Sequence, residues 1–73
     1  MTIQPGQIYR SCDPRGGPRI RISSYIPGHA RAHVVDAHAG KRFRQILVTA
    51  LHADATTRDG RSRRTGYVLE VDP

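Results

Sequence analysis

The sequence is poor in the groups that stabilise very small secreted proteins. It has a single cysteine, Cys12, and no tryptophan among its 73 residues. One cysteine cannot form a disulfide within the chain, and this scarcity fits a reducing cytoplasm better than secretion. The first residues also lack the basic and apolar segments of an export signal. We therefore expect a cytoplasmic protein, and this length leaves room for one domain, residues 1–73, with one core.

Long hydrophobic runs and acidic residues are scarce too. The longest nearly apolar stretch, residues 46–51, is far shorter than the roughly 20 residues that a membrane-spanning helix needs, so we expect no membrane insertion. There are 6 Asp and Glu against 12 Lys and Arg, which gives a net charge of +6. A GC-rich genome accounts for arginine over lysine but not for the shortage of acids. The charge favours a polyanionic partner over the alternative of a basic surface that only keeps the protein soluble.

Apolar residues alternate with polar ones, as in β-strands, and no window has the spacing of an amphipathic helix. Five segments between turn-forming residues qualify as strands, namely 7–12, 19–26, 31–38, 41–48 and 66–71. The second alternates most clearly. It places Ile20, Ile22 and Ile26 on one face and Arg19, Arg21, Ser23 and Tyr25 on the other.

These segments predict an all-β fold, a small five-stranded antiparallel barrel with a short helical turn, starting at Leu51, before the last strand. The expected core residues are Ile20, Ile22, Val34, Ile46 and Leu69, with Val48, Tyr67 and Val71 in phase with them. Two registers stay open. Val35 competes with Val34 in segment 31–38, and the pair Phe43 and Leu47 competes with Ile46 in segment 41–48.

Residues 53–65 contain no leucine, isoleucine, valine or aromatic residue. They carry four arginines, Arg58, Arg61, Arg63 and Arg64, around the turn-forming pair Asp59-Gly60. This composition indicates a solvated, mobile loop. Such a loop either grips phosphates or simply remains solvated.

The order of turn and core residues resembles that of small SH3-like barrel proteins of actinobacteria and their phages, most of them uncharacterised. The residues that carry this resemblance are Gly6-x-x-Tyr9, Asp13-x-Arg15, Ile46 with Leu51, and Gly66-Tyr67-x-Leu69. More distantly, Pro5-Gly6-Gln7-Ile8 and Gly28-x-x-x-Ala32-x-Val34 are similar to KOW-type barrels of ribosomal and transcription-associated proteins, without their glycine-centred turn. The resemblance implies a fold over most of the chain rather than a function.

Cations and two aromatic residues concentrate on the polar positions of the predicted strands and in the arginine-rich loop. The predicted nucleic-acid-binding residues are Arg19, Arg21, Tyr25, Arg31, Lys41, Arg42, Phe43, Arg44, Arg61, Arg63 and Arg64. Arginines on one curved face would follow a phosphate backbone, and Tyr25 and Phe43 would offer stacking surfaces for unpaired bases. The alternative is that the two rings close the ends of the barrel while the arginines maintain solubility.

Signs of catalysis and of metal binding are missing. The six acids are scattered, and no nucleophile with a base or phosphate-binding loop has a recognisable spacing. His29, His33 and His38 lie four and five residues apart, which on a strand does not suit one zinc ion. We therefore expect no enzyme, no cofactor and no metal. The sequence favours a small accessory protein that binds DNA or RNA through phosphates, and the alternative is a module that docks an acidic or extended peptide.

Overall fold

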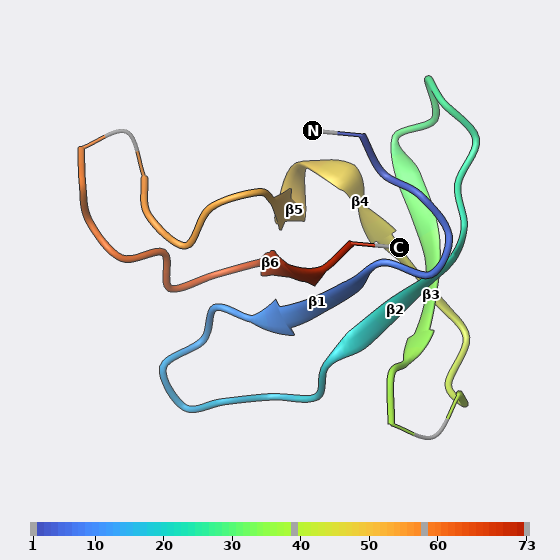
Figure 1. Ribbon diagram of the computed structural model, residues 1–73, viewed down its shortest axis with the longest axis horizontal. Helices are drawn as coiled ribbons and strands as arrows, with labels where there is room; N and C mark the ends of the chain where they lie inside the picture. Colours follow the sequence, from blue (N-terminus) through green and yellow to red (C-terminus); the bar gives the residue numbers. More distant parts are fainter. Residues whose placement is uncertain (1, 39, 58, 73) are drawn as a thin grey trace.

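The computed structural model describes residues 2–38, 40–57 and 59–72, and they form one strongly curled sheet (Figure 1). Its strands are β1 (Ile8–Ser11), β2 (Ile20–Ser24), β3 (Arg31–Asp36), β4 (Arg44–Leu47), β5 (Leu51–His52) and β6 (Tyr67–Val71). The order across the sheet is β4-β3-β2-β1-β6-β5. A single 3₁₀ turn, η1 (Val48–Ala50), joins the two edge strands β4 and β5, so the sheet is a nearly closed barrel.

The all-β prediction is confirmed, but the strand count is wrong. The described residues form six strands rather than five, and β5 pairs with β6 in parallel, whereas the other neighbours are antiparallel. The predicted helical turn lies three residues earlier than expected. It spans Val48–Ala50, and Leu51 begins β5 instead of the turn. The chain is extended there because Leu51 and His52 pair with Tyr67 and Val68 of β6, and this pairing lets the Leu51 side chain enter the core.

The core lies on the inner side of the curled sheet. It consists of Tyr9, Ile20, Ile22, Ala32, Val34 and Leu51, and Ile46 and Leu69 pack against it while half-buried. Neighbouring strands bring these residues into direct register, as where Ile22 faces Val34. All five predicted core residues are thus confirmed: Ile20, Ile22 and Val34 are fully buried, and Ile46 and Leu69 are half-buried.

The alternation of β2 breaks after Ile22. Ile22 faces Val34, but the register between β2 and β3 shifts before Ser24, which marks a β-bulge. A bulge adds one residue to one strand and so reverses which side the following residues take. Tyr25 therefore packs against the core, and Ile26 is 61% exposed. The predicted orientations of Tyr25 and Ile26 are both wrong for this reason.

The structure settles the two open registers. Val34 belongs to the core, and Val35 is also buried although it lies on the opposite side of β3. Ile46 packs against the core, whereas Phe43 and Leu47 are exposed. In β6, Tyr67 and Leu69 contact the core as predicted, but Val71 is exposed and Val68 is buried instead.

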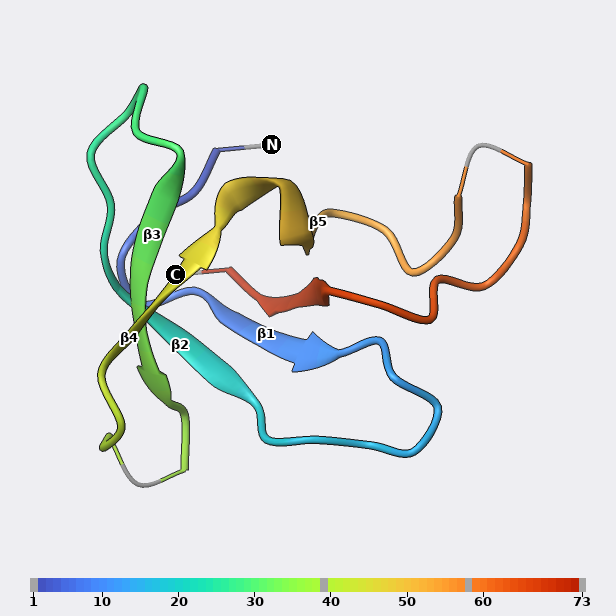
Figure 2. The ribbon, with the colours of Figure 1, turned by 180° about the vertical axis from the view of Figure 1, so that it is seen from behind.

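The two ends of the described chain lie close together in both views (Figures 1 and 2). Gln7 joins them, and it is the only buried polar residue of the described chain. Its Nε2 donates to the Thr2 carbonyl oxygen at 2.9 Å and to Asp72 Oδ1 at 3.2 Å. Its Oε1 accepts from the Tyr9 hydroxyl at 3.1 Å. Burial, with a smaller contribution from the nearby Asp72 carboxylate, raises the pKa of Tyr9, which therefore remains a neutral donor.

Replacing Ile22 by alanine is expected to unfold most of the protein. Ile22 is 1% exposed in the centre of the core. Such a truncation costs about 2–5 kcal/mol, and a core of this size supplies roughly 3–5 kcal/mol in total. Urea unfolding followed by far-ultraviolet circular dichroism measures the loss. A variant as stable as the wild type would contradict this core.

Gly66 is expected to be intolerant of any side chain. Its φ is +79°, and a Cβ there would lie 2.6 Å from the Ala50 carbonyl oxygen and 2.9 Å from His52 Nε2. Gly60 is a matched control, because its φ is +80° but nothing lies near its Cβ position. Gly60→Ala should cost only the left-handed backbone strain, roughly 1–2 kcal/mol. Gly66→Ala should lower the free energy of unfolding further, and equal losses in urea titrations would refute the steric contact.

Candidate nucleic-acid interface

The solvent-facing side of β2, β3 and β4 forms one surface, which we call the outer face. Cross-strand pairs place Arg21 opposite Val35, His33 opposite Gln45, and Arg31 opposite Leu47. The alternation that sends Ile20, Ile22, Ala32 and Val34 into the core sends these residues outward. The outer face carries two arginines and a histidine but no acidic residue.

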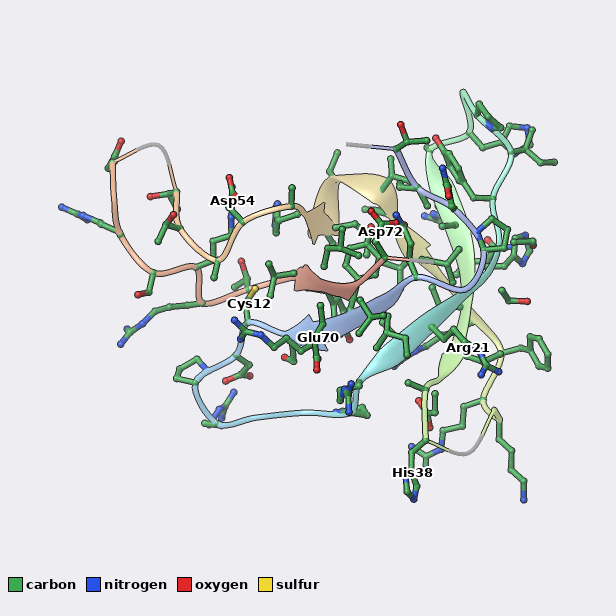
Figure 3. All side chains as sticks on the ribbon, viewed as in Figure 1. Cys12, Arg21, His38, Asp54, Glu70 and Asp72 are labelled. Atoms are coloured by element: carbon green, nitrogen blue, oxygen red, sulfur yellow. The ribbon has the colours of Figure 1, made fainter. Side chains whose placement is uncertain are left out.

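Three exposed cations on or beside the outer face have no carboxylate partner among the residues described. They are Arg21 and Arg31 on the strands and Lys41 in the turn between β3 and β4. Arg21 extends toward that turn, because its Nη2 would lie 3.6 Å from a Cβ placed on Gly40. Figure 3 shows Arg21 on the side of the sheet away from the long loop that precedes β6. Their full charge is available to an anion.

Three other predicted binding residues are engaged by acids. Arg19 Nη2 lies 2.8 Å from Glu70 Oε1, so that this ion pair spans β1 from the start of β2 to β6. Arg42 and Arg44 flank Asp36, each at 3.9 Å from one carboxylate oxygen. The Asp36 side chain is 17% exposed, and its Oδ1 accepts no hydrogen bond, so the carboxylate depends on these two guanidinium groups. Two cations on one acid still leave one positive charge at this turn.

The structure separates the two predicted stacking residues. Tyr25 packs against the core, and its hydroxyl donates to the His29 carbonyl oxygen at 3.3 Å. Phe43 is 75% exposed and lies just before β4, on the side of the outer face. Phe43 is therefore the more exposed of the two rings, while Tyr25 is half-buried.

Two shallow hollows follow one another along β3. One, of about 310 Å³, lies between Arg21, Val35, Gly40 and Phe43, with Pro5 and Gly6 as its far wall. The other, of about 460 Å³, is lined by His29, Arg31, His33, Gln45 and Leu47. The two hollows share no lining residue, but His33 of one and Val35 of the other are successive outward-facing residues of β3, so both hollows lie on the outer face. The sequence shows a turn at Pro5-Gly6 but gives no sign of this wall, which depends on backbone hydrogen bonds that hold Gly6 and Gln7 against Ile22 of β2.

The loop arginines lie apart from the outer face. The loop between β5 and β6 extends from the opposite end of the barrel (Figures 1 and 2). It contains a small hairpin, with a bridge between Thr56 and Ser62. Arg63 is half-buried and donates through Nε to the Asp54 carbonyl oxygen at 3.0 Å, whereas Arg61 and Arg64 are exposed. Arg58 lies outside the described residues.

Two features were sought in the described residues, a group of metal-binding side chains and a helix long enough to cross a membrane. Within residues 2–38, 40–57 and 59–72, no three His, Cys, Asp or Glu side chains are grouped to hold a metal ion. His29 and His33 do line the same hollow, but no third ligand joins them. No helix in this part of the chain is long and apolar enough to cross a membrane.

The stability of the protein is expected to fall when His52 must take up a proton. Burial, and then the positive charge of Arg63, lower the pKa of His52 below its usual 6.5. The unfolded chain therefore binds this proton more readily, so the contribution of His52 is present at neutral pH. It is lost as the pH falls from about 6.5 toward the lower pKa of the folded state.

His52→Gln should remove this part of the pH dependence and leave the rest unchanged. Unfolding free energies measured in urea between about pH 8 and pH 5 test this, because carboxylates titrate mostly below that range. Identical pH profiles for the variant and the wild type would contradict it.

Comparison with known proteins gives no information on the function of this chain. No protein-family model, no curated protein and no solved structure matches this chain. The charge and geometry of the outer face therefore carry the functional argument.

Proposed function

We propose that this protein binds nucleic acid through its phosphate backbone, with the outer face of β2–β4 as the interface. It acts as a small accessory protein of the cytoplasm, has an SH3-like barrel fold and is not an enzyme. The 3₁₀ turn that precedes the final strands is compatible with such a barrel. Contacts made mainly to phosphates would bind many sequences alike, because phosphates carry no sequence information.

The observation that carries this proposal is the unequal distribution of charge. Two acids of the barrel form ion pairs away from the outer face. Glu70 pairs with Arg19, and Asp36 lies between Arg42 and Arg44. The outer face has no acid, and Arg21 and Arg31 stand on it unpaired within the described residues. Arg31 lies four positions before Val35, the residue paired with Arg21, so the two cations lie roughly 13 Å apart along β3. A flexible phosphate backbone can reach both.

Replacing Arg21 and Arg31 together by glutamate is expected to abolish most binding and leave the fold intact. Both side chains are exposed and unpaired, and such charges contribute under about 1 kcal/mol to stability. Affinity should fall alike for DNA and RNA oligonucleotides of every sequence in fluorescence anisotropy. The slope of log affinity against log salt should flatten by roughly 0.7–0.9 for each lost phosphate contact.

Arg15 and Arg10 supply the matched control. Arg15 pairs with Asp13 in the loop after β1, and Arg10 lies on β1, outside the outer face. Their double glutamate variant has the same net charge, so equal losses of affinity would mean that charge alone matters. If the wild type binds neither DNA nor RNA at about 50 mM salt, where phosphate contacts are strong, docking of an acidic peptide becomes the better account.

A further inference from the structure

We propose that Phe43 and Arg21 form a stacking site for an unpaired base, so that the protein prefers single-stranded nucleic acid to duplex. This inference rests on the proposed function and adds the form of nucleic acid that the outer face recognises. Its starting point is the position of Phe43. The ring is 75% exposed, more than any other large apolar side chain described, and it contributes nothing to the core.

The backbone beneath Phe43 is held by a hydrogen-bonded turn. Asp36 N donates to the Lys41 carbonyl oxygen at 2.9 Å, and Gly40 N donates to the Asp36 carbonyl oxygen at 2.8 Å. Arg42 adopts a left-handed conformation, with φ of 62°, immediately before Phe43. These hydrogen bonds restrain the backbone just before Phe43, so binding a base there would cost less backbone entropy than binding it on an unrestrained segment.

Arg21 supplies a second flat group beside the ring. Arg21 and Phe43 line the same hollow, and the guanidinium reaches over Gly40 at the turn that carries Phe43. Guanidinium planes and aromatic rings both stack on nucleobases, and an unpaired guanidinium also binds phosphate. Val35 adds an apolar side chain to the lining of the hollow. The hollow therefore combines three features that suit a nucleobase: the flat ring of Phe43, the apolar Val35 and the cation of Arg21.

Away from its two ends, a duplex cannot use this site without being opened. Its internal base faces are covered by their neighbours, so Phe43 could reach one only by unstacking a base pair. A single strand exposes base faces at no such cost. Arg31 and His33 line the second hollow farther along β3, and the unpaired Arg31 offers a cation to the adjoining phosphates of a strand whose base is stacked on Phe43.

Two substitutions at Phe43 separate stacking from general apolar contact. Phe43→Leu keeps an apolar side chain but loses the flat ring, and should weaken binding of a labelled single strand of about 12 nucleotides roughly 5- to 150-fold, the loss of one base stack. Binding to a duplex of the same length should not change. Phe43→Trp should keep the affinity, and because the chain has no other tryptophan, its fluorescence should be quenched by the single strand and not by the duplex.

Ile26→Ala is the control for loss of an exposed apolar group, because Ile26 is 61% exposed but lies in the turn between β2 and β3. Its affinity should equal that of the wild type. Equal wild-type affinity for single strands and duplex, or no effect of Phe43→Leu on single-strand binding, would overturn the stacking site. The proposed function would survive that result if the variant at Arg21 and Arg31 still lost binding. Absence of any wild-type binding would overturn both.

Discussion

The burial of Gln7 between the two ends of the chain is the constraint on which the rest of the structure depends. Its side-chain amide forms four hydrogen bonds. Nε2 donates two, and Oε1 accepts two, from the Tyr9 hydroxyl and from the backbone nitrogen of Gln4. A buried polar group left unpaired costs about 1–3 kcal/mol, a large part of the stability of a domain this small. The first residues and Asp72 must therefore both be in place. Gln7 directly precedes β1, so these bonds tie both chain ends to the strand that pairs with β2 on one side and β6 on the other.

The alternation of apolar and polar residues could predict those strands that have one face against the core and the other in water. Segment 19–26 showed the pattern because Ile20 and Ile22 face the core while Arg21 faces water. The prediction failed where geometry depends on a neighbouring strand. The bulge before Ser24 arises from the pairing with β3, and nothing in β2 alone marks it. A strand of two residues such as β5 is too short to show a period of alternation. Its parallel pairing with β6 depends on residues 67 and 68, which come much later in the sequence.

The candidate site, too, could be predicted from the sequence only in part. The sequence identified the cations and the two aromatic residues, because residue type alone suggests their chemistry. It could not show which cations are neutralised, since Arg19 pairs with Glu70 from the other end of the chain. Nor could it separate Phe43 from Tyr25, because the bulge turns Tyr25 toward the core. What the structure adds is therefore a selection among the predicted residues, with Arg21, Arg31 and Phe43 left exposed together.

An acid-free face has an electrostatic consequence that helps to distinguish binding from simple solubility. Unpaired cations on one face repel each other, and this small cost to the folded state is screened by salt. Solubility requires only net charge, which arginines placed beside acids would supply as well. A phosphate backbone removes the repulsion and releases counterions at the same time. Because Arg21 alternates with Ile20 and Ile22 on one strand, the protein can maintain this charged face without exposing its core.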